Sequence, residues 1–377
     1  MVIHGLYGSE LRSPKSSSSL FGRGGSVKWM STGTVLSTFL FRNSSGHPGL
    51  AHPLLGLGQD DLETADLLMS YKGWQKFAFA TNKSGKARVL HYLWDFRRPV
   101  QLAVDGFDAF MDGLASSGVS PITLVTHSTG SMIAFPVINK RPSLFSSWFS
   151  VGGAIGPGPS ALYDLNVQGR GFFIDHPLPT TLISATTLAT FPPLFGFLSQ
   201  DSTCLVDDST GEPVPGNLYD VEDWVRLKLG PWSRAADTTE PCVVSDDLKA
   251  HIKECLSVAQ LFRRQLDDGH ARLVKPASDY RHLKIFCYGV DHTPTVSKVR
   301  WSGARGSALR NEGHAETTPG DGTVQGVNWR KIPCDLPSVV VFGGNSAHSE
   351  LPNEEKLHDL VLKAAMNNQG GEGDTRI

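Results

Sequence analysis

The chain has 377 residues, and its 35 Lys and Arg residues against 37 Asp and Glu residues give a formal net charge of −2. A chain this close to neutral lacks the basic character of a dedicated nucleic-acid-binding protein. With 19% charged and 9% aromatic residues it is also unlike a disordered chain, and its length allows one large domain or two smaller ones, each able to bury a core.

The secondary structure expected along the chain alternates between strands and helices. Strands are predicted at short, β-branched apolar runs, namely 2–3, 88–94, 121–126, 148–151, 283–288 and 338–342. Helices are predicted where apolar residues recur three and four positions apart, namely 103–114, 220–229, 245–267 and 353–366. This alternation indicates an α/β fold with a mostly parallel sheet and helices on both of its faces.

The strand rhythm stops in the middle of the chain, where Pro, Thr, Asp and aromatic residues mix without a sustained pattern. We therefore predict that residues 1–156 and 282–366 form two parts of one core and that residues 157–281 form an inserted cap or lid. The polar, Gly-rich residues 367–377 are expected to be a flexible tail.

Targeting signals are absent from the sequence. No run of about 18 apolar residues is free of charge and proline, so no transmembrane helix is predicted. The start has no signal-peptide pattern, and the chain opens abruptly on a strand, so we expect a truncated N-terminus. Two glycosylation sequons, at Asn43 and Asn82, are compatible with the secretory pathway, and membrane association is the other candidate location.

A candidate nucleophile stands between a predicted strand and a predicted helix. Thr126-His127-Ser128-Thr129-Gly130 differs from the G-x-S-x-G pattern of a nucleophile elbow only in its first residue. In such a turn Ser128 is the nucleophile and the amide of Thr129 binds an oxyanion. The alternative is a serine in a surface turn. Pro136 in the following helix predicts a kink or an early end.

A second oxyanion amide is expected in the turn after the first strand. His4-Gly5-Leu6-Tyr7-Gly8 follows that strand, and in the α/β-hydrolase arrangement the amide of Leu6 would face the nucleophile. The alternative is an ordinary glycine turn.

The base and its acid are chosen by their positions in the chain. In this arrangement the order is Ser, then Asp or Glu, then His. Asp321, between two glycines, and His348, just after the last predicted strand, fit these positions. The alternative for Asp321 is a calcium-like or Asx turn, because Asp-Gly is a common turn dipeptide. The rival bases are His292 and His314, and His127 is expected to face away from the nucleophile.

Seven motifs in chain order resemble those of the lecithin:cholesterol acyltransferase family, which includes phospholipid:diacylglycerol acyltransferases and belongs to the α/β-hydrolase superfamily. They are His4-Gly5-Leu6-Tyr7-Gly8-Ser9-Glu10-Leu11, Trp94-Asp95-Phe96-Arg97, His127-Ser128-Thr129-Gly130, Gly153-Ala154-Ile155-Gly156-Pro157-Gly158-Pro159-Ser160, Tyr288-Gly289-Val290 with Pro294-Thr295, Gly320-Asp321-Gly322-Thr323-Val324, and His348-Ser349-Glu350-Leu351. The resemblance implies Ser128, Asp321 and His348 as a catalytic triad and the amides of Leu6 and Thr129 as the oxyanion hole. It also implies a disulfide between Cys287 and Cys334, as in the secreted members, and no metal or cofactor.

The function expected from this resemblance is acyl transfer between lipids. A fatty acyl group would pass from a phospholipid or other lipid ester, through Ser128, to a sterol or diacylglycerol, with the protein in peripheral contact with a membrane or lipoprotein surface. Tyr7 in the oxyanion loop and the apolar cap residues Phe195 and Phe197 are expected to contact lipid. The alternatives are a phospholipase A or lipase with the same triad and a non-catalytic hydrolase-like binding protein.

Overall fold

A parallel sheet forms the centre of the computed structural model, which describes residues 1–6, 8–12, 27–29, 63–67, 71–166, 188–200, 202–233, 244–274, 282–302, 315–329 and 339–367. Its six strands are β1 (Val2–Ile3), β5 (His91–Tyr92), β6 (Ile122–His127), β7 (Phe145–Val151), β9 (Lys284–Gly289) and β12 (Val339–Gly343). Their spatial order is β12-β9-β7-β6-β1-β5, and every neighbouring pair is parallel. The carboxyl ends of all six strands therefore lie along one edge, where the functional residues of such sheets gather.

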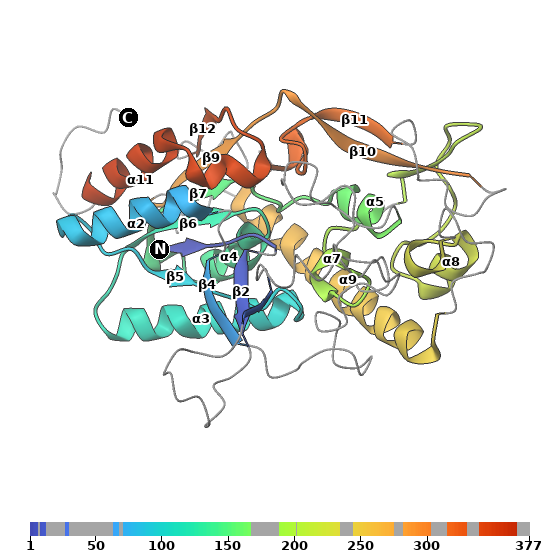
Figure 1. Cartoon of the computed structure of the whole chain (residues 1–377), viewed down its shortest axis with the longest axis horizontal. Coiled ribbons are helices and arrows are strands. Elements are labelled where there is room, and N and C mark those ends of the chain that lie inside the picture. The colour runs from blue at the N-terminus through green and yellow to red at the C-terminus, as the bar shows by residue number, and fades with distance from the viewer. Residues whose placement is uncertain are drawn as a thin grey trace.

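Helices cover both faces of this sheet (Figure 1). On one face lie α2 (Lys72–Ser84) and α11 (Glu355–Asn367), and on the other lie α3 (Val100–Ser116) and α4 (Thr129–Lys140). Successive strand side chains point to opposite faces, so the fully apolar strands feed two cores. Within β6, Val125 packs with Trp74 of α2, whereas Leu124 belongs to the cluster that holds Phe107 of α3. The sequence prediction of helices on both faces is confirmed.

The part of the chain between β7 and β9 supplies a separate group of elements, which lies to the right of the sheet in Figure 1. Its helices are α5 (Ser160–Asn166), α7 (Pro192–Phe195), α8 (Val221–Leu227) and the 29-residue α9 (Asp246–Val274), together with the 3-10 helix η6 (Gly230–Trp232). They share a continuous apolar core with α4, because Leu194, Phe262 and Phe135 belong to one cluster of buried residues. We refer to this group as the cap.

A small three-stranded sheet connects the cap to the later part of the chain. It contains β8 (Leu205–Asp207), β10 (Thr293–Trp301) and β11 (Ala315–Gly320) in the order β11-β10-β8. The pairing of β8 with β10 joins residues on either side of position 281, where the cap was predicted to end. The hairpin of β10 and β11 therefore contacts the cap through β8. The boundaries of the cap at 157 and 281 stay a prediction.

The remaining elements are short. A second small sheet consists of β3 (Val27–Trp29), β2 (Ser9–Arg12) and β4 (Glu63–Leu67), and α10 (Gly326–Trp329) follows β11. Two further 3-10 helices are η4 (Pro142–Leu144) and η9 (His348–Asn353). The expected strand at 88–94 shortens to β5, and α4 continues through Pro136 to Lys140 rather than ending early.

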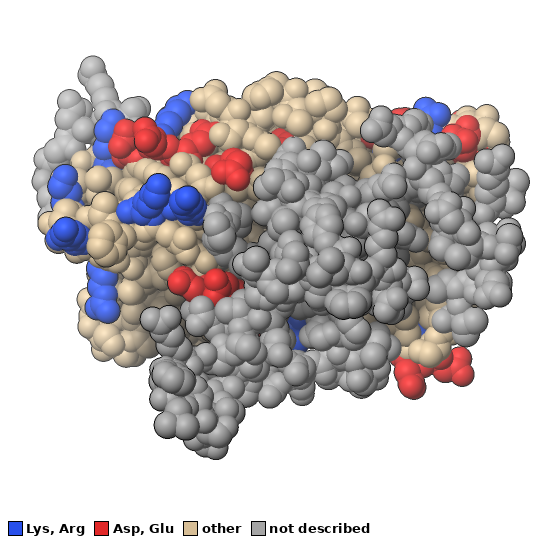
Figure 2. Space-filling model, viewed as in Figure 1, with Lys and Arg blue, Asp and Glu red and all other residues tan. Residues whose placement is uncertain are grey.

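Mixed charge covers the end of the molecule that holds α2 and α11. There Lys and Arg side chains lie beside Asp and Glu side chains (Figure 2). Exposed Lys72 and Lys76 of α2 and exposed Glu355 and Asp359 of α11 contribute to this surface. Among the helices that the structure describes, none is both long and apolar enough to cross a membrane.

Candidate active site

Ser128 stands in a sharp turn between β6 and α4. Its backbone angles, φ 54° and ψ −123°, lie in a region that costs a side-chain-bearing residue about 1–3 kcal/mol and that is concentrated at functional sites. The turn is possible because Gly130 lets α4 approach β1, since a Cβ there would lie 2.6 Å from the carbonyl oxygen of Ile3. This strand, strained turn and helix match the context that a nucleophile elbow requires.

Thr126 occupies the elbow position where the usual pattern has glycine. Its side chain is fully buried, and its hydroxyl accepts a hydrogen bond of 2.9 Å from Nε1 of Trp148 on β7. The same oxygen lies 2.8 Å from Oγ of Ser131 in the first turn of α4. The extra side chain is therefore accommodated by a polar contact that ties the elbow to the neighbouring strand.

Asp321 and His348 form a buried pair. Asp321 directly follows β11, is fully buried, and accepts a hydrogen bond from Nδ1 of His348 at 2.6 Å on one carboxylate oxygen. Its other oxygen accepts from the amides of Thr323 at 3.0 Å and Val324 at 2.6 Å. The amide of His348 donates to the carbonyl of Asp321 at 3.1 Å, so side chains and backbones both hold the pair. The Asx-type turn considered as an alternative for Asp321 is present, and it orients the carboxylate toward His348.

The hydroxyl of Ser128 and the imidazole of His348 both lie at the carboxyl edge of the sheet. Ser128 is 6% exposed and His348 is 7% exposed. The described part of the chain contains no hydrogen bond between Oγ of Ser128 and Nε2 of His348. Such contacts often form only when substrate is bound, because catalytic hydrogen bonds are commonly long in a ligand-free site.

Two segments that carry the predicted oxyanion amides meet at Ser128. Thr129 is the first residue of α4, so its amide has no acceptor within the helix. Gly5 packs directly on Ser128, since a Cβ at that position would lie 2.8 Å from Cβ of Ser128. The hydrogen bond of 3.2 Å from the amide of Gly8 to the carbonyl of Gly5 closes the turn that contains Leu6. Tyr7, predicted to contact lipid, lies outside the described residues.

His4 anchors this oxyanion turn, a role that sequence reasoning missed. Its ring stacks on Trp94 with the ring centroids 5.6 Å apart, and its Nδ1 donates to the carbonyl of Gly5 at 2.7 Å. Its Nε2 accepts from the amide of Trp94 at 3.2 Å. Burial lowers the pKa of His4 to about 4, so the ring is neutral near pH 7 and can keep this donor and acceptor arrangement.

Tyr71 and His127 are two further buried residues that sequence reasoning did not assign. The hydroxyl of Tyr71 lies 2.7 Å from Nδ1 of His127, and Nε2 of His127 lies 2.9 Å from the carbonyl oxygen of His348. Burial, and then the neighbouring His348, hold the pKa of His127 well below its ordinary range. The side chain of His127 is thus engaged with Tyr71 and with the backbone beside the base, and it does not serve as a base for Ser128.

A small pocket opens beside Ser128 under the cap. Its volume is about 30 Å³, and Ala154, Ala161, Val324 and Phe197 line it together with polar Asn328. None of the residues that line it carries a charge. As far as the described residues define it, this pocket is too small to hold a whole acyl chain.

The other predicted site residues are placed as follows. Phe195, two residues before Phe197, is fully buried, packs on Trp224 of the cap with the ring centroids 5.5 Å apart, and does not line the pocket. Cys287 is buried in β9, and Cys334 lies outside the described residues, so the disulfide between them stays a prediction. The rival base His292 is exposed, and His314 lies outside the described residues.

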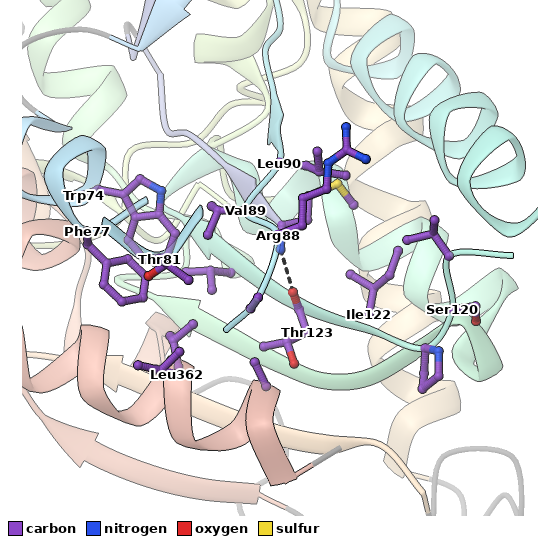
Figure 3. Close-up of a pocket in the computed structure, with 17 residues that line it drawn as sticks. Trp74, Phe77, Thr81, Arg88, Val89, Leu90, Ser120, Ile122, Thr123 and Leu362 are labelled. Carbon is purple, nitrogen blue, oxygen red and sulfur yellow. Dashed lines mark hydrogen bonds between the residues drawn. The ribbon is translucent and has the colours of Figure 1, made fainter. Parts of the chain in front are cut away.

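A larger cavity of about 400 Å³ lies away from Ser128, Asp321 and His348 (Figure 3). The cavity is lined by Trp74 and Phe77 of α2, by Leu362 of α11, and by Val89 and Ile122. Ser120 and Thr123 place it at the start of β6, whereas Ser128 follows the end of that strand, about 20 Å away along the sheet at 3.3 Å per residue. The chemistry of the site, rather than cavity size, therefore locates the candidate active site. Among the described residues, no cluster of three or more His, Cys, Asp or Glu side chains could hold a metal ion.

Comparison with known proteins supports the fold. No protein-family model matches the chain, and no curated protein matches its sequence. A chain of the Tle4–Tli4 complex is similar over 97% of this chain and 97% of that chain, with a TM-score of 0.52 and 12% identity. Weaker similarity is found to a carboxylesterase from the ammonia-oxidizing thaumarchaeon Nitrososphaera gargenis, with a TM-score of 0.35 and 11% identity over 79% of this chain and 87% of that chain. It is also found to esterase E22, with a TM-score of 0.30 and 12% identity over 97% of this chain and 88% of that chain.

The strand order, the all-parallel sheet, the helices on both faces and the elbow at Ser128 together define an α/β-hydrolase fold. None of the similarities supports the lecithin:cholesterol acyltransferase family specifically, and that resemblance stays a prediction.

Proposed function

We propose that the protein is a serine esterase that cleaves the carboxylic esters of lipids through an acyl-enzyme on Ser128. The observation that carries this proposal is the hydrogen bond of 2.6 Å between buried Asp321 and His348, at the same sheet edge as a serine in a strained elbow. A serine, a buried carboxylate and an imidazole, in this chain order, form the arrangement that activates a hydroxyl for acyl transfer.

The proposed reaction has two halves. Nε2 of His348 takes the proton of Ser128 as Oγ attacks the ester carbonyl, and Asp321 holds the Nδ1 proton and stabilises the imidazolium. The amides of Leu6 and Thr129 donate to the oxyanion. His348 then protonates the leaving alcohol, and the acyl group stays on Ser128. Water or a second alcohol, deprotonated by the same imidazole, releases the acyl group and restores the hydroxyl of Ser128.

A lipid ester is the proposed substrate because the pocket beside Ser128 is uncharged and largely apolar. Phe197 and Ala161 offer contacts for an acyl chain, and the partly polar wall at Asn328 could hydrogen-bond the ester or its leaving alcohol. We propose a phospholipid or a neutral lipid, reached by peripheral contact with a membrane or lipoprotein surface.

Transfer of the acyl group to a lipid alcohol is the second candidate function. Ala161 and Phe197 of the cap line a small, uncharged pocket beside Ser128, and a site that excludes water favours an alcohol acceptor over hydrolysis. The motif resemblance to the lecithin:cholesterol acyltransferase family supports the same assignment, with a sterol or diacylglycerol as acceptor.

A lipid-panel assay separates these functions. The purified protein is incubated with phosphatidylcholine, triacylglycerol or sterol ester, with and without saturating sterol or diacylglycerol, and the products are identified by mass spectrometry. Ser128→Ala is the control. Fatty acid that depends on Ser128 supports the esterase, and a new ester that forms only with acceptor supports transfer. Fatty acid alone at saturating acceptor excludes transfer, and equal product from the wild type and Ser128→Ala excludes the esterase.

A further inference from the structure

A buried chain of three hydrogen bonds links the oxyanion turn to the segment that carries the base. It begins at the amide of Gly5, which donates to the hydroxyl of Tyr71 at 2.8 Å. It continues from Tyr71 to Nδ1 of His127 at 2.7 Å and from Nε2 of His127 to the carbonyl of His348 at 2.9 Å. Tyr71 is 3% exposed and His127 is 6% exposed, so water does not compete for these bonds.

With the ring of His127 neutral, the two ends of this chain fix the direction of every proton in it. The amide of Gly5 can only donate, and the carbonyl of His348 can only accept. Tyr71 therefore accepts from Gly5 and donates its own proton to Nδ1 of His127. That leaves the proton of His127 on Nε2, where it is donated to His348. Burial raises the pKa of Tyr71 and lowers that of His127, so both groups keep the protons that this arrangement needs.

A second contact ties the same parts together. Tyr71 is the residue just before α2, and two amides in the first turn of α2, those of Gly73 and Trp74, donate to Oδ1 of Asn353 at 2.9 and 3.2 Å. Asn353 ends η9, the 3-10 helix that starts with His348. The start of α2 is thus bonded directly to Asn353 at one end of η9 and, through His127, to His348 at the other end, which restrains Tyr71 relative to this segment.

We propose, on the basis of the serine esterase function above, that Tyr71 and His127 are positioning residues that set the spacing between the oxyanion amide of Leu6 and the imidazole of His348. Neither touches the substrate in this account. Tyr71 holds Gly5, the residue before Leu6, and His127 holds the backbone of the base itself. The neutral ring of His127 also lies 4.7 Å from the ring of His348, so it adds no opposing charge when His348 becomes an imidazolium.

The test compares Tyr71→Phe, His127→Gln and His127→Leu with the wild type. Each protein is titrated with a fluorophosphonate, whose labelling amplitude counts folded active sites and whose rate constant reports how well each site is arranged. A soluble p-nitrophenyl ester gives kcat and KM. Tyr92→Phe is the matched control, because the Tyr92 hydroxyl also donates one hydrogen bond, to the carbonyl of Ala103 at 2.9 Å, but lies away from the site.

We expect Tyr71→Phe to keep the full labelling amplitude and to lose about 10- to 100-fold in labelling rate and in kcat, with little change in KM, since a misplacement of about 1 Å can cost about 10²-fold. His127→Gln keeps a donor near the carbonyl of His348 and should retain more activity than His127→Leu. A loss confined to amplitude, or rates within twofold of the wild type for Tyr71→Phe, would overturn the proposal.

An NMR measurement tests the same proposal without relying on activity. The ¹⁵N shifts of the His127 ring at pH 7 should show the neutral form with its proton on Nε2, and Tyr71→Phe should shift Nδ1. A charged ring, or a proton on Nδ1, contradicts the proposed proton arrangement. A wild type that shows the expected ring but takes up no fluorophosphonate overturns the esterase, and with it the positioning role, while leaving the hydrogen-bonded chain intact.

Discussion

Replacing Gly5 with alanine tests how closely the oxyanion turn must approach the nucleophile. The added methyl group would lie 2.8 Å from Cβ of Ser128 and 3.1 Å from Nδ1 of His127. Carbon atoms in contact prefer about 3.5–4.0 Å, so the turn has to move by about 0.7 Å or more. Because the amide of Leu6 moves with it, the turn no longer offers a donor at the position of the oxyanion.

The expected loss follows from that displacement. A misplacement of about 1 Å can cost about 10²-fold, and the loss of one oxyanion donor costs about 10²- to 10³-fold in kcat. We therefore expect Gly5→Ala to lower kcat about 100-fold, which corresponds to about 2.7 kcal/mol, with a much smaller change in KM. The assay is steady-state cleavage of a p-nitrophenyl ester, normalised to the folded fraction measured by circular dichroism.

Gly113→Ala in α3 is the matched control for this substitution. Gly113 is exposed, and a Cβ there meets no atom within 4 Å. The control should be slightly more stable, by about 0.5–1 kcal/mol, since alanine favours a helix over glycine, and it should leave kcat unchanged. A folded Gly5→Ala protein with kcat within threefold of the wild type would refute the reasoning about the oxyanion turn.

Three further substitutions test other parts of the site. Asp321→Asn should lower kcat about 10³- to 10⁴-fold at similar KM in the same ester assay, because an amide does not stabilise the imidazolium of His348. Phe197→Ala should raise kcat/KM for long-chain esters relative to short ones, measured over a chain-length series, because it enlarges the pocket of about 30 Å³ beside Ser128. Glu354→Gln should destabilise the protein above about pH 5, and this destabilisation should shrink as the pH falls below 4.5, as followed by thermal unfolding. Burial raises the pKa of Glu354, but hydrogen bonds from Tyr288 and from the segment before His348 outweigh this and bring it below its ordinary 4.5. A lowered pKa stabilises the fold above the unfolded value, and that contribution is lost as the pH falls through the folded value.

Each of these expectations has a contradicting result. For Asp321→Asn it is a kcat within tenfold of the wild type, which would mean that the buried carboxylate does not support the base. For Phe197→Ala it is an unchanged chain-length preference in a folded protein. For Glu354→Gln it is a stability difference that stays constant from pH 3 to pH 7, since that would exclude a link to the ionisation of this carboxyl.

The core of the fold could be predicted because its strands can be recognised from short runs of consecutive residues. The residues of β6 are mostly apolar and β-branched, and a turn of small residues follows them. Both the buried strand and the elbow at Ser128 can therefore be predicted from neighbouring residues. Asp321 and His348 were selected by their order in the chain and their place after predicted strands. The structure brings these two side chains together at 2.6 Å.

Other parts depend on packing that no local pattern carries. The contact of Tyr71 with His127 joins residues 56 positions apart, and it exists only because α2 begins beside the end of β6. The pairing of β8 with β10 involves a strand of only three residues, in a stretch whose sequence shows no sustained strand pattern. Phe195 and Phe197 look equivalent in the sequence, but only Phe197 lines the pocket beside Ser128, since the short helix α7 turns Phe195 into the cap core.

Trapping of the acyl-enzyme is the most direct test of the central claim, that Ser128 is the nucleophile of an esterase. The wild type and Ser128→Ala are mixed with an activated ester, quenched in acid within milliseconds to seconds, and analysed by intact-protein and peptide mass spectrometry. We expect one acyl adduct on the wild type, located at Ser128, and none on the variant. Ester cleavage without an adduct at Ser128, or equal cleavage by Ser128→Ala, would contradict it.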